Sequence, residues 1–201
     1  MTDRRVPTDS VSVGPLGKFG VFRPKQGPSG TWHWGVDLAE PQGSPVFAPE
    51  RMTIVAVWRD DKTAPFVGYG PAGVLAQGIG PGNIGQPHYH LLAHLDPGGW
   101  DDNGIRSDVD AAGVVIPLDR VLTPTKGETF EAGQQVGVIS NLGHTHWEIR
   151  REPIDSPSTR AGNTYDPLAW VKDGSLNMVT LPDPTDWSWL WWVAAIYLLA
   201  R

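Results

Sequence analysis

The sequence predicts a mostly β protein built around one compact domain at residues 20–172. Glycine and proline account for 24 and 19 of the 201 residues and are spread along the chain. Such usage is typical of chains with many turns and short strands. β-Branched and aromatic residues gather in short runs between these turn residues. Residues 30–150 contain no stretch with the period of an amphipathic helix, so helices are not expected to build the core.

The first half of the domain is predicted to be a series of short strands. Strand-like runs cover residues 33–57, where turn residues interrupt them at 40–43 and 48–50. The glycine-rich stretch 63–87 is predicted to be loop or hairpin. It is not a phosphate-binding loop, because no Gly-Lys-Ser/Thr follows its glycines. Another strand is predicted over residues 88–95.

The second half begins with a predicted excursion from the domain at residues 97–127. This stretch is polar and turn-rich around a small apolar patch. Two strands are predicted over residues 130–139 and 145–149, and a short closing element over 166–171.

Charge and cysteine content exclude several function classes. The chain carries 16 Lys and Arg against 22 Asp and Glu, a net charge of −6. A general nucleic-acid binder would need a basic face to replace the counterions on phosphates, so none is expected. The absence of cysteine excludes disulfides, iron–sulfur clusters and thiolate zinc sites.

The two ends of the chain are predicted to be appendages. Residues 1–19 are expected to form an irregular arm or a peptide that docks on a partner. No apolar run of signal-peptide length follows Arg4 and Arg5, so we see no secretion signal. Residues 173–186 are predicted to be a linker to a tail at residues 187–201.

The tail is predicted to be a short hydrophobic C-terminal helix. Between residues 187 and 200 only Ser188 is clearly polar. Fourteen helical residues reach about 21 Å, which is short of a hydrocarbon core of about 30 Å. Tryptophans crowd one end and Arg201 closes the other, as in interfacial anchors. Three roles stay open for Trp187–Arg201: insertion into a membrane, docking on a protein partner, or packing on its own domain.

The six histidines are the main candidates for chemistry, since imidazole is both a common metal ligand and a common general base. They form three groups: His33; His88, His90 and His94; His144 and His146. His33 and Asp37 stand four residues apart with a glycine between them, so they can converge on one zinc ion. The alternative is a histidine at a strand edge beside a solvated aspartate.

The pair His144 and His146 lies on one face if the segment is a strand, because side chains alternate. One imidazole can then bind a metal while the other acts as a base; the alternative is two surface histidines. By the same alternation Glu148 shares the face of His146 and can support it. For His88 and His90 we expect hydrogen-bonded, partly buried histidines.

Four segments together resemble the lysostaphin-type (LytM-like) zinc endopeptidases. HWGVDLAEPQGSPVFAPERMTIVAV resembles the His-x-Gly-x-Asp segment of that family, and YHLLAHLD its Tyr-x-His-Leu segment. KGETFEAGQQVGVISNLGHTHWEIR resembles the glycine-containing strand that leads into His-x-His-Phe-Glu, and YDPLAWV the Pro-Leu closing segment. The segments occur in the family's order and cover about residues 30–172. The resemblance implies a lysostaphin-like (duplicated-hybrid-motif) antiparallel β-sandwich with long loops.

The resemblance also implies a set of site residues. His33, Asp37 and His146 would be the ligands of Zn²⁺. His144 would be the general base, or one of a catalytic histidine pair with His94. The substrate implied is a peptide cross-link or stem peptide of bacterial peptidoglycan.

Three departures from the family pattern leave specificity open. The loop SNLG before the His-x-His motif is short, residues 97–127 look like an insertion, and Trp147 replaces the usual Phe. None of these removes a motif residue, but the altered loops are expected to line the substrate groove.

We therefore predict a zinc metallo-endopeptidase that hydrolyses peptidoglycan. Because no secretion signal is seen, we expect a virion- or secretion-machine-borne cell-wall hydrolase, such as a virion-associated phage lysin or endolysin, held in its assembly or in a membrane by the tail. The alternative is a non-catalytic structural or wall-binding module of the same fold. A histidine phosphocarrier explains the His-x-His motif less well, because it gives Asp37 no role.

Overall fold

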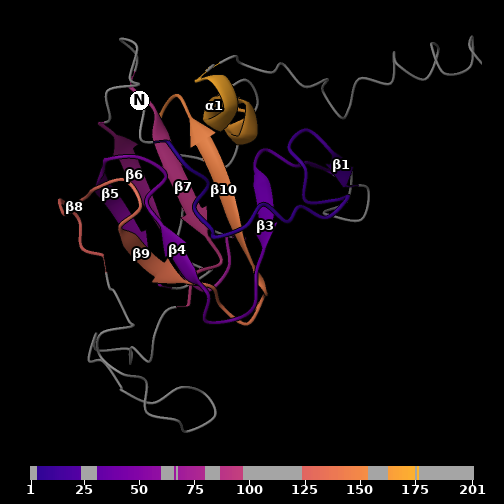
Figure 1. Ribbon diagram of the computed structural model, residues 1–201, viewed down its shortest axis with the longest axis horizontal. Helices are drawn as coiled ribbons and strands as arrows, with labels where there is room; N and C mark the ends of the chain where they lie inside the picture. The colour runs from indigo at the N-terminus through magenta and orange to yellow at the C-terminus, as the bar shows by residue number, and fades with distance from the viewer. Residues whose placement is uncertain are drawn as a thin grey trace, which may run out of the picture.

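The computed structural model describes residues 4–23, 31–59, 66, 68–79, 87–96, 124–153, 163–174 and 176. Among these residues, seven strands form one main sheet, and every pairing in it is antiparallel. The order is β11-β10-β7-β6-β5-β8, and the other edge of β10 is shared by β11 and β3 (Figure 1). The strands are β3 (Val36–Ala39), β5 (Met52–Trp58), β6 (Gly73–Gly78), β7 (Tyr89–Ala93), β8 (Thr129–Phe130), β10 (His144–Arg150) and β11 (Thr164–Tyr165).

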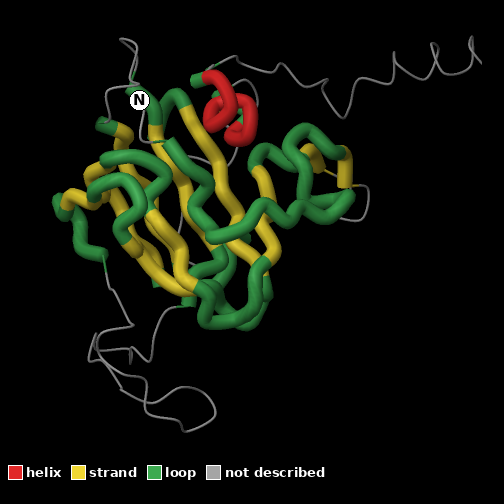
Figure 2. Tube along the Cα trace, viewed as in Figure 1, coloured by secondary structure: helices red, strands yellow, loops and turns green. Residues whose placement is uncertain are grey.

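One face of this sheet carries the main hydrophobic core. The two-stranded sheet of β4 (Pro45–Phe47) and β9 (Gln135–Val138) forms a second layer, and its Val46 and Val136 join the core cluster of the main sheet. Helix α1 (Pro167–Asp173) contributes Trp170, whose ring meets that of Trp147 edge-on. Figure 2 shows that helix beside the sheet, with strands making up most of the remaining regular structure. The prediction of a mostly β fold with antiparallel sheets is confirmed.

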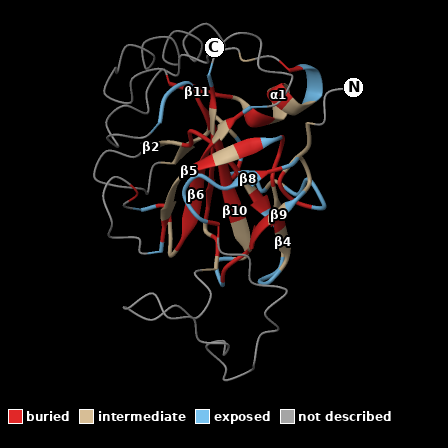
Figure 3. Ribbon diagram, turned by 90° about the vertical axis from the view of Figure 1, so that its left-hand side faces the viewer, coloured by how far each residue is buried: buried red, intermediate tan, exposed pale blue. Residues whose placement is uncertain are grey.

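The opposite face of the sheet is divided between a smaller apolar cluster and polar side chains. Trp58, Tyr69 and Leu91 belong to the apolar cluster. Along β10, Trp147 and Ile149 lie in the main core, so the residues that alternate with them point to this second face. Figure 3 shows buried and intermediate residues along the strands, and in β10 every residue after the first is buried.

Strand β6 corrects the expectation that residues 63–87 are only loop or hairpin. It pairs with both β5 and β7 in the middle of the sheet. Its end glycines allow close packing: a Cβ at Gly73 would lie 2.2 Å from Trp58 Cζ2, and one at Gly78 2.1 Å from Glu50 Oε1. Sequence reasoning interpreted these glycines as turn residues, whereas they stand where neighbouring side chains leave no room.

Two further differences concern the segments around the domain. The strand predicted over residues 130–139 is divided by a turn at 131–134 into β8 and β9. The described part of the N-terminal arm packs along the domain: Phe47 N donates to Pro7 O, and Asp37 N to Gly17 O, both at 2.8 Å.

Several predictions fall on residues that the structure does not describe. These include nearly all of the 97–127 excursion, most of the 173–186 linker and the whole tail at 187–201. Within the described part of the chain, no helix has the length and apolar character needed to cross a membrane.

Candidate metal centre and cleft

A cleft of about 1090 Å³ opens on the second face of the sheet. It collects side chains from separate parts of the chain: the arm, the β1–β2 hairpin, β3, the end of β7, and β10. Strands β1 (Phe22–Arg23) and β2 (Thr31–Trp32) pair with each other at its side. The polar side chains that line the cleft are Arg23, His33, Asp37, Tyr69, His94, His144, His146 and Glu148.

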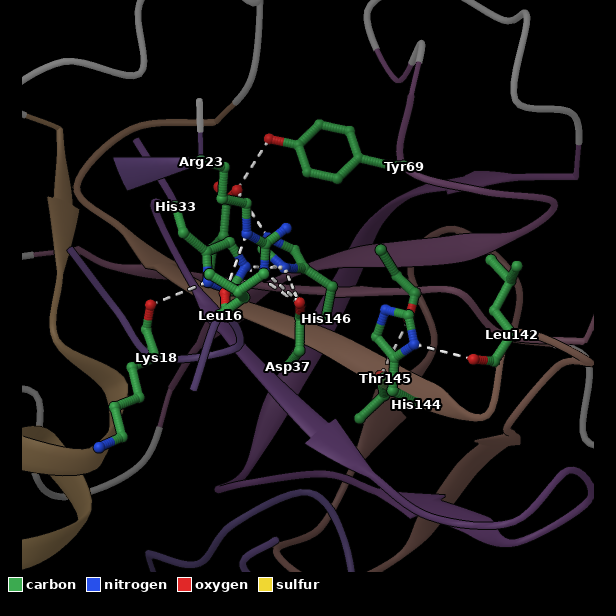
Figure 4. Close-up of polar contacts among 12 residues, drawn as sticks. Leu16, Lys18, Arg23, His33, Asp37, Tyr69, Leu142, His144, Thr145 and His146 are labelled. Atoms are coloured by element: carbon green, nitrogen blue, oxygen red, sulfur yellow. Dashed lines mark hydrogen bonds and ion pairs between the residues drawn. The ribbon is translucent and has the colours of Figure 1, made fainter. Parts of the chain in front are cut away.

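Three of these residues converge on one point (Figure 4). Asp37 on β3 lies directly across from His146 on β10, and His33 enters from the segment before β3. Asp37 Oδ1 lies 2.7 Å from His146 Nδ1 and 3.1 Å from His33 Nε2, and the two nitrogens are 2.9 Å apart. Gly35 allows this approach, because a Cβ there would lie 2.7 Å from His146 Cε1.

The outer ring nitrogens fix which atoms point inward. His33 Nδ1 donates to the Lys18 carbonyl at 3.0 Å, and His146 Nε2 donates to Glu148 Oε1 at 2.9 Å. His33 Nε2 and His146 Nδ1 are then left to offer lone pairs, as the ligands of a metal do. Tetrahedral zinc with bonds of about 2.0–2.1 Å places neighbouring ligand atoms about 3.3 Å apart, close to the triangle seen here. Two imidazoles and one carboxylate therefore fit Zn²⁺ in chemistry and in size.

Glu148 is itself held by two partners on its sheet face. Its Oε1 accepts from the Tyr69 hydroxyl at 2.9 Å, and its Oε2 accepts from Arg150 Nη1 at 2.8 Å. Glu148 and Arg150 are both buried. The carboxylate that orients His146 is thus fixed at both oxygens.

The ionisation of the three residues follows from these contacts. Burial alone would raise the pKa of Asp37, but hydrogen bonding with His146 and His33 lowers it well below its usual range. Burial alone would lower the pKa of His146, but its hydrogen bonds to Asp37 and Glu148 raise it to about 9. Burial lowers the pKa of His33 despite its contact with Asp37. Without a metal, one proton on His146 Nδ1 occupies the point where a cation would be bound.

A second histidine pair lies beside this centre. The rings of His94 and His144 meet edge-on, with centroids 4.6 Å apart. His144 Nδ1 donates to the Leu142 carbonyl at 3.0 Å, which leaves Nε2 as its proton acceptor. His94 is the only described non-glycine residue with a positive φ, at 61°; such strain is often stored at functional sites.

The ring of His94 is held uncharged. Burial, followed by the nearby His146 and His144, lowers its pKa to about 3. Its Nδ1 is buried and has no hydrogen-bond partner in the described structure. A side chain at Gly70 would place Cβ 2.3 Å from that nitrogen, so the glycine makes room for the ring.

A second cluster of one carboxylate and two histidines lies in the core. Glu50 Oε1 contacts His88 Nε2 and lies 3.0 Å from His90 Nε2, and all three residues are buried. Trp147 Nε1 donates to His90 Nδ1 at 3.2 Å, so a neutral His90 carries its hydrogen on Nε2 and points it at Glu50. This arrangement suits a hydrogen-bonded network rather than a metal. His88 and His90 are hydrogen-bonded, as expected, and more deeply buried than expected.

The structure brings all five predicted site residues to one cleft: His33, Asp37, His94, His144 and His146. Sequence reasoning missed Arg23 and Tyr69, which contact Asp37 and Glu148. It also missed Glu50 as the partner of the core histidines. No spacing signal marks these residues, because each lies on a different segment from the group that it contacts.

Comparisons with known proteins identify the fold. No protein-family model matches this sequence, and no curated protein sequence does. The solution structure of lysostaphin matches with a TM-score of 0.53 and 18% identity, over 93% of this chain and 62% of that one. CbpA from L. salivarius REN matches with a TM-score of 0.55 and 15% identity, over 85% of this chain and 95% of that one.

The catalytic domain of lysostaphin, an antimicrobial peptidase from Staphylococcus simulans, matches at 20% identity, with a TM-score of 0.49, over 81% of this chain and 93% of that one. This chain spans less than two thirds of the full lysostaphin structure. The first two likenesses show that the chain has the lysostaphin fold.

Proposed function

We propose that this chain, which has the lysostaphin fold, is a zinc-dependent endopeptidase that hydrolyses peptide bonds of bacterial peptidoglycan. The observation that carries the proposal is the convergence of His33 Nε2, Asp37 Oδ1 and His146 Nδ1, with their outer nitrogens already bonded. The motif resemblance supplies the substrate class, and lysostaphin, which shares the fold, is described as an antimicrobial peptidase.

In this proposal His33, Asp37 and His146 would hold Zn²⁺. When bound, zinc supplies Lewis-acid polarisation of the scissile carbonyl and lowers the pKa of water towards neutrality. Two imidazoles and one carboxylate would be three protein ligands, the number that catalytic zinc sites use.

His144 is assigned the proton transfers. With its Nδ1 hydrogen donated to the Leu142 carbonyl, it accepts a proton at Nε2 from the attacking water. It then returns that proton to the nitrogen of the leaving amine, so the peptide C–N bond breaks and no net proton is consumed at the histidine. Its place in the cleft beside His146 suits this role.

His94 is assigned the stabilisation of negative charge on the carbonyl oxygen. Because its pKa is lowered to about 3, the ring is neutral at physiological pH and carries one N–H to donate. The positive φ of His94 fixes its backbone, and the ring is already oriented against His144 before substrate binds.

Release of new amino groups from purified peptidoglycan tests the proposal. We expect release by the zinc-loaded full chain, none with a chelator present, and a loss of about 10²–10⁴-fold for His144→Ala. His144→Ala should still bind zinc, because His144 is not among the three converging ligands. Zinc binding at one ion per chain without release from any wall type would favour a non-catalytic wall-binding module instead.

Delivery is a separate part of the proposal and has sequence support alone. The Trp-rich residues 187–201 would hold the hydrolase in a virion, a secretion-type assembly or a membrane. A variant truncated after Asp186 is expected to keep wall cleavage and to lose sedimentation with lipid vesicles or with the assembly. Loss of cleavage in a folded truncated variant would show that the tail is more than an anchor.

A further inference from the structure

Arg23 contacts the metal-site aspartate from the side opposite the histidines. It lies on β1 and lines the cleft, with a side chain that is 16% exposed. Its Nη2 forms an ion pair with Asp37 Oδ2, while Asp37 Oδ1 faces His33 and His146. The two oxygens of one carboxylate thus have separate partners.

The guanidinium is itself fixed by the N-terminal arm. Both Nε and Nη2 donate to the Leu16 carbonyl, at 2.9 and 2.7 Å. The next residue of the arm, Gly17, accepts from Asp37 N at 2.8 Å, and a Cβ on Gly17 would lie 3.1 Å from Asp37 Cβ. The arm therefore contacts the backbone of Asp37 directly, and it contacts the side chain of Asp37 by way of Arg23.

We propose that Arg23 is a positioning residue that holds Asp37 as a one-oxygen metal ligand and connects the N-terminal arm to the metal centre. The inference rests on the proposed function. A carboxylate bonded on one side only can rotate about its terminal torsion, which has broad minima. The planar guanidinium engages Oδ2 in a charge-assisted bond of fixed direction, so Oδ1 stays aimed at the two histidine nitrogens.

Zinc affinity of the full-length protein is the direct test. Competition with a chromophoric chelator should show about 10–100-fold weaker binding for Arg23→Met, the range typical of partners that orient a ligand. Arg23→Lys should recover part of this loss, because it restores the charge but not the planar fork. Arg51→Met is the matched control, since Arg51 also pairs with a carboxylate, Glu131, but is 54% exposed and does not line the cleft.

A second readout separates positioning from substrate binding. At saturating zinc, Arg23→Met should lower kcat and leave KM for a peptide substrate nearly unchanged. A raised KM with unchanged zinc affinity would overturn the inference and make Arg23 a binder of a substrate carboxylate. Thermal unfolding of each variant with chelator present identifies any variant that fails to fold. If Arg23→Met fails to fold, the zinc affinity and kinetics of Arg23→Lys test the inference in its place.

The two proposals fail in different ways. If the wild-type chain binds no zinc, the proposed function fails and this inference fails with it. If the wild-type chain binds one zinc ion and Arg23→Met binds it equally well, only the inference fails.

Discussion

The described residues contain two clusters that each join one carboxylate to two histidines, and the outer hydrogen bonds of the two clusters run in opposite directions. In the cleft, His33 and His146 give their outer hydrogens to Lys18 and Glu148, and their remaining nitrogens converge with Asp37. In the core, His90 accepts from Trp147 on its outer nitrogen and points its hydrogen inward at the carboxylate of Glu50.

The contrast shows that residue type and proximity do not define a metal site. Both triads bring their ligand atoms within 4.8 Å of one another. The direction of the hydrogens differs because the outer partners differ: a carbonyl and a carboxylate accept hydrogens, whereas an indole N–H donates one. The groups that bond the outer ring nitrogens therefore decide whether a neutral histidine presents a lone pair or a hydrogen to the centre of its triad.

The largest expected effect is a loss of folding stability when the core triad loses its carboxylate. Glu50→Ala leaves two buried histidines without their carboxylate and should cost about 3–5 kcal/mol in the free energy of unfolding. Urea denaturation measures this, with Glu131→Ala as control because its side chain is 69% exposed. Bound zinc per chain should stay unchanged in Glu50→Ala; a fall in zinc content would mean that the core triad binds metal.

The next effect concerns the partner that orients His146. Glu148→Gln keeps an oxygen that can accept from His146 Nε2 but removes the negative charge, so zinc affinity should fall about 10–100-fold. Chelator competition is the measurement, and Glu128→Gln, on an exposed turn, is the matched control. Equal zinc affinities for wild type and Glu148→Gln would show that zinc binding does not depend on the charge of Glu148.

The pH dependence of zinc binding gives the next effect, which for each pH unit lies at the lower end of that range. The pKa of His146 is raised to about 9 in the metal-free protein, so zinc must displace one proton at neutral pH. Because the proton is bound only in the metal-free form, raising the pH favours the complex. Apparent affinity should increase about tenfold per pH unit from pH 7 to about 9. Calorimetry in buffers of different ionisation enthalpy should detect the released proton; an affinity that is flat with pH would contradict this.

When no metal is bound, both clusters should lose stability in acid, through Asp37 and Glu50, and the cleft cluster should also lose it in alkali, through His146. The raised pKa of His146 gives stability that is fully present below pH 6.5 and is lost as the pH rises through about 9. The lowered pKa of Glu50 gives stability that is present above pH 4.5 and is lost as the pH falls toward about 2.

Melting temperatures measured against pH with chelator present would show an acid limb and an alkaline limb, where stability is lost. Each kcal/mol of lost stability should lower the melting temperature by about 2–4 °C. Glu50→Gln should flatten only the acid limb. If Glu50→Gln changed the alkaline limb and left the acid limb as in wild type, the assignment of the acid limb to Glu50 would be wrong.

Much of the fold and the converging residues could be predicted from the sequence. Strand alternation placed His144, His146 and Glu148 on one face, and the structure has them there. The spacing of His33 and Asp37 across a glycine indicated that both could reach one point, which they do. These are local patterns, set by a strand period or by a short turn.

What could not be predicted depends on contacts between distant segments. Gly73 and Gly78 have the residue type of a turn, yet they lie in a central strand because Trp58 and Glu50 fill the space beside them. Arg23 contacts Asp37 while the arm carbonyl at Leu16 accepts hydrogen bonds from the same guanidinium. The proton arrangement of each triad likewise depends on partners that no spacing identifies.

The most direct test of the central claim is the zinc content of the purified full-length protein after equilibration with zinc at neutral pH. The wild-type chain should hold one ion, Asp37→Ala none, and Glu50→Gln one. Two ions in the wild type, or one in Asp37→Ala and none in Glu50→Gln, would contradict the distinction drawn between the cleft triad and the core triad.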